Sequence, residues 1–220
     1  MKISDIKDKI HEKLFSVLEK DISELRPCQE KAVNAGLLEG KNLLVCTPTA
    51  SGKTLIAEIA ALETILKKRR IAVYIAPLKA LANEKFKDFS RKYSHICKTA
   101  LSIGDLDKAD PYLAKYDLII MTSEKFDSLI RHNCTWLGEV KLVIIDEIHL
   151  LNDPGRGPTL EILITMLRRL VKDIQVIGLS ATIGNPEELA EWLDAELVID
   201  SWRPVELKKG LMVNNEVEFF

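Results

Sequence analysis

The feature that most constrains the fold of this chain is a series of short apolar runs alternating with stretches of helical periodicity. The runs are rich in β-branched residues and apolar throughout, which is typical of strands buried on both faces of a parallel sheet. Helical stretches between such strands indicate βαβ units, so we expect an α/β fold: a doubly wound, mostly parallel sheet with helices on both faces. The expected strands are Asn42–Cys46, Ile71–Ala76, Leu118–Thr122, Leu142–Asp146 and Ile174–Ser180, and the expected helices are Asp5–Glu19, Cys28–Leu38, Leu55–Leu66, Leu78–Tyr93, Ser123–Arg131 and Thr159–Val171.

The composition is that of an ordinary globular protein, because 47% of the 220 residues are apolar and 29% are charged. The 31 Lys and Arg residues against 33 Asp and Glu give a formal net charge of −2, which excludes a uniformly basic wrapper of nucleic acid but not a local binding face. The four cysteines show no C-x-x-C spacing, so we expect reduced thiols. Without a signal peptide, or an apolar run of about 18–20 residues, we expect a cytoplasmic protein with no membrane partner.

A phosphate-binding loop is predicted between the first expected strand and the helix after it. Thr47–Thr54 meets the pattern G-x-x-x-x-G-K-[ST] except at its first position, where Thr47 replaces glycine. Gly52 lets the backbone approach a phosphate closely, Lys53 supplies a positive charge to the β- and γ-phosphates, and the Thr54 hydroxyl suits Mg²⁺. The loop therefore predicts a nucleoside triphosphate site, with backbone N–H groups of Thr49, Ala50 and Ser51 also facing the phosphates.

An acidic pair follows the apolar run Leu142–Ile145 directly. Ligands of such sheets gather at the carboxyl ends of the strands, so we expect the pair to lie at the ligand-binding edge of the sheet. Asp146 is then expected to hold the magnesium ion, and Glu147 to orient or deprotonate an attacking water.

Asp146–His149 reads Asp-Glu-Ile-His, and Ser180–Thr182 reads Ser-Ala-Thr after the next expected strand. These segments resemble the D-E-x-H box and the S-A-T motif of superfamily 2 helicases. The other matches are Pro77–Leu81 to motif Ia, Thr122–Lys125 to motif Ib and Leu25–Gln29 to the upstream glutamine motif.

A finer resemblance rests on three further segments, Arg156–Glu161, Gly184–Leu189 and Trp202–Val205. These segments resemble the Ski-type helicases, and among them the archaeal DNA-repair helicases of the Hjm type. The resemblance covers the chain from about Leu25 to Pro204, and the superfamily tolerates Thr47 in place of glycine. It implies an N-terminal helical segment at 1–24, a RecA-like ATP-binding lobe at 25–200, and at 201–220 the start of a linker to a second lobe.

Position by position, the resemblance implies the following roles for ATP and Mg²⁺. The adenine side would be met by Arg26 and Gln29, catalysis would use Lys53, Asp146 and Glu147, and the metal would be held by Thr54 and Asp146. Coupling of ATP state to strand grip would fall to His149, Ser180 and Thr182. Nucleic-acid contacts would come from Pro77, Lys79, Gly104, Asp105, Thr122 and Ser123, whereas Tyr74, Trp136 and Trp192 are expected to be core or rim aromatics.

The implied function is that of the ATP-binding motor lobe of a 3′–5′ DNA helicase in DNA repair or replication-fork processing, in an archaeal cell. Its partners would be single-stranded or forked DNA and the second RecA-like lobe, and the apolar tail Val217–Phe220 suggests a cut inside a longer protein. The isolated lobe is expected to bind ATP but not to unwind. Two alternatives stay open: a Ski-type RNA helicase, and a nucleotide-binding scaffold without catalysis.

Overall fold

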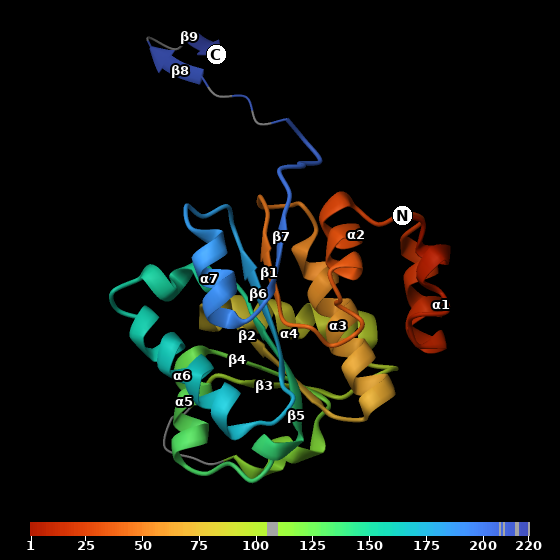
Figure 1. Ribbon diagram of the computed structural model, residues 1–220, viewed down its shortest axis with the longest axis vertical. Coiled ribbons are helices and arrows are strands. Elements are labelled where there is room, and N and C mark those ends of the chain that lie inside the picture. The colour runs from red at the N-terminus through yellow and green to blue at the C-terminus, as the bar shows by residue number, and fades with distance from the viewer. Residues whose placement is uncertain (105–109, 207, 209, 214–215, 220) are drawn as a thin grey trace.

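The computed structural model describes residues 1–104, 110–206, 208, 210–213 and 216–219. A seven-stranded sheet forms its centre, in the order β3-β4-β2-β5-β6-β1-β7, and every neighbouring pair is parallel (Figure 1). The expected α/β sheet is confirmed, and it is wholly parallel. Its strands are β1 (Leu43–Cys46), β2 (Ile71–Ile75), β3 (Thr99–Ser102), β4 (Leu118–Met121), β5 (Val140–Ile145), β6 (Gln175–Ser180) and β7 (Glu196–Ile199); β8 (Gly210–Val213) and β9 (Glu216–Phe219) form a separate antiparallel hairpin.

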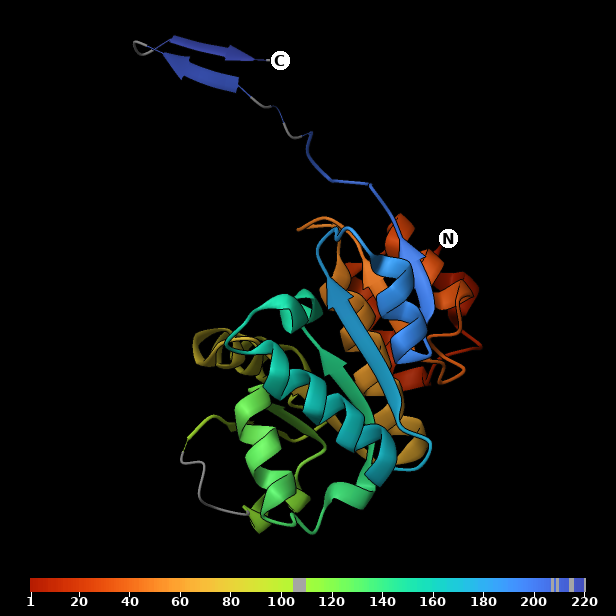
Figure 2. The same ribbon diagram turned by 60° about the vertical axis from the view of Figure 1, so that its left-hand side comes forward.

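Helices cover both faces of the sheet, as Figure 2 shows. The side chains of successive strand residues point to opposite faces of the sheet: Leu43 and Val45 belong to one core cluster, whereas Leu44 and Cys46 belong to the other. The first cluster lies under α1 (Glu12–Asp21), α2 (Pro27–Asn34), α3 (Lys53–Lys68) and α4 (Lys79–Tyr93); the second lies under α5 (Ser123–Arg131), α6 (Gly157–Leu170) and α7 (Pro186–Leu193). Short 3-10 helices are η1 (Ile3–Ile6), η2 (Pro111–Lys115), η3 (Leu137–Glu139) and η4 (Ile148–Asn152).

The N-terminal stretch is two helices rather than the one expected over Asp5–Glu19. The chain breaks after η1, and α1 begins where the His11 side chain accepts a hydrogen bond from the Lys13 N–H. Leu14 and Leu18 enter the same core cluster as α3, and the Met1 ammonium pairs with Glu30 of α2 at 2.6 Å. Residues 1–24 therefore pack as part of the first helical layer.

In the described part of the chain, no helix is both long enough and apolar enough to cross a bilayer. The cysteines Cys28, Cys46, Cys97 and Cys134 are all buried as free thiols. Burial raises the pKa of Cys46 to about 11, so that thiol stays protonated near neutral pH.

Candidate nucleotide site and nucleic-acid face

The strand order sorts the predicted site residues into two neighbouring groups. The adjacent strands β1, β6 and β5 lead into the phosphate loop, Ser180 and the acidic pair after Ile145, respectively. The adjacent strands β2, β4 and β3 lead toward Pro77, Thr122 and Gly104. Because parallel strands end at one edge of the sheet, the residues predicted to bind the nucleotide and those predicted to bind nucleic acid lie in two halves of that edge.

Two residues of the phosphate loop have a left-handed backbone, Ala50 with φ 64° and Gly52 with φ 107°. A Cβ atom at Gly52 would lie 2.4 Å from Gln29 Nε2, so glycine is required there both by conformation and by space. Thr47, which stands where the pattern has glycine, is fully buried, and its Oγ1 lies 2.7 Å from Ser51 Oγ. This hydroxyl pair closes the loop across its base, and it gives a structural reason for threonine at the position where the pattern has glycine.

Lys53 begins α3 and directs its ammonium toward the ends of β1 and β6. Its Nζ donates to the carbonyl oxygens of Thr47 at 2.7 Å and of Ser180 at 2.8 Å. Burial lowers the pKa of Lys53, and the nearby charges of Glu147 and Asp146 oppose that shift. The ammonium is thus held in the cleft that Asp146 and Glu147 also line, and its third N–H is available to a ligand.

The acidic pair is held by the backbone of β2 and by its own turn. The Asp146 N–H donates to the Ile75 carbonyl at 2.9 Å, and the Glu147 N–H donates to Asp146 Oδ1 at 3.1 Å. The chain turns sharply at Glu147, whose φ of 51° is left-handed, a conformation that is uncommon for non-glycine residues. His149 Nδ1 lies 3.3 Å from Glu147 Oε2, without the alignment of a hydrogen bond.

Together these groups line an open cleft of about 490 Å³. The Thr54 hydroxyl and the Asp146 carboxylate are hard oxygen ligands of the kind that Mg²⁺ prefers. In the described residues, no group of three or more His, Cys, Asp and Glu side chains could hold a metal alone. This donor set fits Mg²⁺, which is usually bound through one or two protein oxygens together with substrate phosphates. The other lining residues are Arg26, Thr49, Ala50, Gly52, Lys53, Lys85, Glu147 and Pro204.

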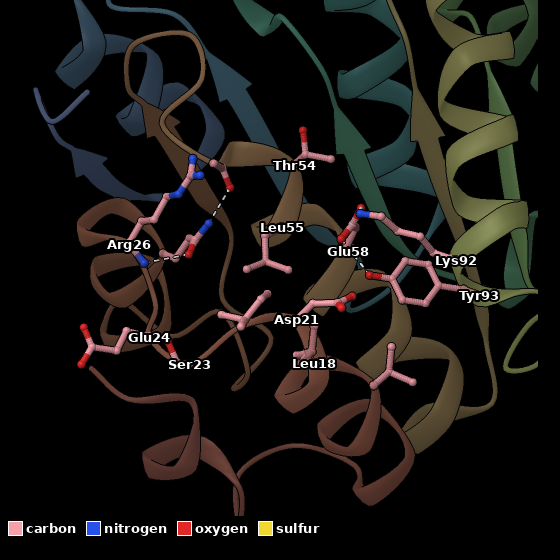
Figure 3. Close-up of a pocket in the computed structure, with 14 residues that line it drawn as sticks. Leu18, Asp21, Ser23, Glu24, Arg26, Thr54, Leu55, Glu58, Lys92 and Tyr93 are labelled. Atoms are coloured by element: carbon pink, nitrogen blue, oxygen red, sulfur yellow. Dashed lines mark hydrogen bonds and ion pairs between the residues drawn. The ribbon is translucent and has the colours of Figure 1, made fainter. Parts of the chain in front are cut away.

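A second pocket, of about 570 Å³, lies between α1, the start of α2, and α3 (Figure 3). Beside it Gln29 is 4% exposed; its Nε2 donates to the Gly52 carbonyl at 3.0 Å and its Oε1 accepts from the Arg26 N–H at 2.8 Å. The Gln29 amide retains a second N–H donor and a second acceptor position. Arg26 Nη1 donates to the Ala50 carbonyl at 2.8 Å, and its guanidinium stacks on the Trp202 ring at 5.5 Å.

The three predicted coupling residues have different surroundings. Ser180 is fully buried and its Oγ has no hydrogen-bond partner, whereas its carbonyl is bound to Lys53. Thr182 is exposed and His149 is 34% exposed. Of the three, Ser180 is thus buried at the end of β6 with its carbonyl bound to Lys53, whereas the side chains of Thr182 and His149 are accessible.

Only some of the residues predicted to bind nucleic acid lie together in the structure. Pro77, Lys79 and Thr122 line a shallow pocket of about 270 Å³, next to which Gly104 lines another. Lys79 and Gly104 are exposed, whereas Thr122 is 5% exposed and caps α5 by accepting from the Lys125 N–H at 3.4 Å. The buried Ser123 does not line this pocket, and Asp105 lies outside the described residues.

Four residues make contacts near these sites that the sequence analysis did not predict. Lys85 of α4 donates to Thr54 Oγ1 at 3.4 Å, and Arg156 Nη1 donates to the Pro77 carbonyl at 2.9 Å. Tyr74 is fully buried, as expected of a core aromatic, but its hydroxyl donates to Asp146 Oδ2 at 2.6 Å. Trp202 reaches Arg26 from the far end of the chain. All four depend on contacts between distant segments, which no local pattern predicts.

Comparison with known proteins agrees with this geometry. Residues 26–189 match the family model described as DEAD/DEAH box helicase. The chain is 53% identical over 212 residues to the ATP-dependent DNA helicase Hel308 of Pyrococcus abyssi, covering 96% of this chain and 29% of that protein. It is 55% identical over 205 residues to Hel308 of Methanocaldococcus jannaschii, covering 90% and 17% respectively. The chain thus spans less than a third of the length of these relatives.

Solved structures of the helicase MrfA are also similar. MrfA bound to DNA superposes with a TM-score of 0.74 at 26% identity, and MrfA bound to DNA and AMPPNP with 0.76 at 29%. Each match covers 88% of this chain and 30% of the other. These likenesses confirm the resemblance to superfamily 2 and, through the Hel308 proteins, to the archaeal Hjm-type helicases. The chain belongs to the DEAD/DEAH box helicase family.

Proposed function

We propose that this chain is the ATP-binding motor lobe of an ATP-dependent 3′–5′ DNA helicase that acts in DNA repair or replication-fork processing. The observation that carries the proposal is the convergence of Lys53, Asp146 and Glu147 on one cleft at the ends of β1, β6 and β5. The ends of β2, β4 and β3 adjoin this cleft along the same sheet edge, so a nucleic-acid strand and the nucleotide would be bound side by side.

Each residue of the cleft has a distinct task toward ATP. Lys53 binds the β- and γ-phosphates, and the loop N–H groups from Thr49 to Thr54 hold phosphate oxygens at the positive end of α3. Thr54 and Asp146 would hold Mg²⁺, which neutralises charge on the phosphates when bound. Glu147, 32% exposed toward the cleft, orients a water and accepts its proton.

The adenine is proposed to lie in the part of the neighbouring pocket beside Arg26 and Gln29. The free donor and acceptor of the Gln29 amide suit the N7 and N6 edge of adenine. Because the same amide is bound to the Gly52 carbonyl at 3.0 Å, adenine binding would also brace the phosphate loop.

The nucleic-acid strand is proposed to pass over Pro77, Lys79, Gly104, Asp105, Thr122 and Ser123. Such motors hold mainly phosphates and sugars, so one exposed lysine and several backbone N–H groups are sufficient. His149, Ser180 and Thr182 would couple the nucleotide to this grip. We propose DNA rather than RNA as the substrate, because the Hel308 relatives are named DNA helicases and the similar MrfA structures are bound to DNA.

The complete motor is proposed to need a second RecA-like lobe, which would be part of the longer protein that the short coverage of the relatives suggests. Arginines supplied from outside a phosphate loop raise phosphoryl-transfer rates by about 10³–10⁵ where measured. We therefore expect this 220-residue chain to bind Mg·ATP, to hydrolyse it very slowly and not to separate strands.

The test compares ATP turnover by the chain and by the two-lobe protein, each with and without single-stranded DNA and with matched RNA. We expect strong stimulation by DNA in the two-lobe protein alone. Equal stimulation by RNA would favour the RNA helicase alternative, and absence of turnover in the two-lobe protein would favour a scaffold without catalysis.

A further inference from the structure

We infer that Tyr74 is a positioning residue that holds the Asp146 carboxylate in the orientation in which it binds Mg²⁺. This inference rests on the proposed function, because it assumes that Asp146 meets the metal. Tyr74 lies on β2 opposite Ile144 of β5, and Asp146 follows two residues after Ile144. Side chains two residues apart point to the same face of a strand, so the tyrosine ring and the carboxylate share one face of the sheet.

Both oxygens of Asp146 are engaged. The Tyr74 hydroxyl donates to Oδ2 at 2.6 Å, and the Glu147 N–H donates to Oδ1 at 3.1 Å. A carboxylate held at both oxygens cannot rotate freely, and its remaining lone pairs then point in fixed directions. Hydrogen-bond partners of metal-binding carboxylates typically change metal affinity or activity by about 10–100-fold when removed.

Three properties of Tyr74 suit it to this task. The side chain is 0% exposed, and its ring packs edge-on against Phe89 at 6.1 Å between centroids, so the hydroxyl cannot swing away. The hydroxyl lies 2.6 Å from Asp146 Oδ2, and because a carboxylate oxygen only accepts, the hydroxyl is the donor of this bond.

A matched control exists in the same core. The Tyr93 hydroxyl donates to Glu58 Oε2 at 2.8 Å, and Tyr93 is 3% exposed and also packs against Phe89, at 5.8 Å between ring centroids. Tyr74→Phe and Tyr93→Phe each remove one buried hydroxyl from a carboxylate and keep the ring. Only the first touches the acidic pair; Tyr93 and Glu58 line the second pocket on the side away from Arg26, where adenine is proposed to lie (Figure 3).

The experiment titrates a fluorescent ATP analogue into the chain over a range of Mg²⁺ concentrations. For Tyr74→Phe we expect unchanged affinity without metal and at least a tenfold rise in the Mg²⁺ concentration that gives half-maximal tightening. Tyr93→Phe should lower the melting temperature similarly and leave the Mg²⁺ midpoint unchanged. A Tyr74→Phe midpoint within twofold of the unaltered chain, or an equal shift in Tyr93→Phe, would overturn the inference.

Failure of the proposed function would look different. If the unaltered chain bound no ATP analogue at any Mg²⁺ concentration, the nucleotide site itself would be wrong, and the inference with it. A second measurement needs no variant: the buried Tyr74 hydroxyl proton should give a slowly exchanging NMR resonance that shifts with Mg·ADP and not with metal-free ADP. A resonance that is insensitive to the metal would contradict the role.

Discussion

At the residue scale, the proposed site consists of residues whose positions are fixed by hydrogen bonds to other strands. Lys53 is anchored to the carbonyls at the ends of β1 and β6, and Asp146 is anchored to β2. The identities of these residues were predictable, because a phosphate loop and an acidic pair have recognisable local patterns. The partners of these residues were not predictable, since the hydroxyl of Tyr74 is 72 positions away from Asp146.

Glu147→Gln is expected to lower ATP turnover of the two-lobe protein by about 10²–10⁴-fold, because an amide cannot accept the proton of the attacking water. ATP affinity should stay nearly unchanged, as glutamine keeps the size of the side chain. Steady-state ATPase assays and nucleotide binding measure the two quantities. Glu161→Gln, on the exposed side of α6, is the control with expected normal turnover; normal turnover in Glu147→Gln would remove Glu147 from catalysis.

Asp200 provides a test of pH dependence. Burial acts to raise the pKa of Asp200, but the hydrogen bond from Lys31 at 2.8 Å and the Trp202 N–H outweigh burial, so the pKa is lowered below 3.8. A carboxyl group whose pKa is lowered in the folded protein stabilises the fold at pH values above the pKa of the unfolded chain. This stabilisation is lost as the pH falls through the pKa of the folded protein.

Asp200→Asn should therefore lower the free energy of unfolding by about 1 kcal/mol at pH 7, since Lys31 is half exposed, and by nearly nothing at pH 2.5. Urea denaturation at both pH values measures the difference. Glu196→Gln, which breaks the exposed pair with Lys41, is the control and should change stability by less than about 0.5 kcal/mol at either pH. A loss in Asp200→Asn that persists at pH 2.5 would rule out the ion pair as its cause.

At the element scale, the sequence predicted the interior of the sheet better than its margins. The five expected strands are all present, with ends shifted by up to two residues, because each is apolar on both faces. The strands β3 and β7 were missed since both are edge strands with partly exposed, mixed sequences. The helix α7 was also missed, because Gly184–Leu189 was interpreted only as a family motif.

The contact between η4 and α6 depends on one glycine. A Cβ atom at Gly157 would lie 2.1 Å from the Leu151 carbonyl oxygen, a backbone atom that cannot move aside alone. Gly157→Ala should therefore lower the free energy of unfolding by about 1–3 kcal/mol, as is usual for overpacking. Gly138→Ala is the matched control, since a Cβ atom there meets nothing within 4 Å, and denaturation midpoints should separate the two. Equal stability of both variants would contradict the tight η4–α6 contact.

At the scale of the whole molecule, the strand order turns scattered motifs into two adjoining sites. The order β3-β4-β2-β5-β6-β1-β7 places the three strand ends of the proposed nucleotide site beside the three strand ends of the proposed nucleic-acid path. Two hydrogen bonds join the two halves of this sheet edge. The Tyr74 hydroxyl on β2 donates to Asp146 after β5, and Arg156 donates to the Pro77 carbonyl after β2. The order could not be read from local sequence, because it depends on which crossover packs on which face.

The central claim, that this lobe binds ATP through Lys53, is tested most directly by calorimetric titration of the chain with Mg·ATP. A hydrogen bond to a charged group is worth about 1.5–3 kcal/mol, so Lys53→Ala should weaken binding by at least about tenfold. Lys68→Ala, at the exposed far end of the same helix, should bind as the unaltered chain does. Equal affinity of Lys53→Ala and the unaltered chain would contradict the account.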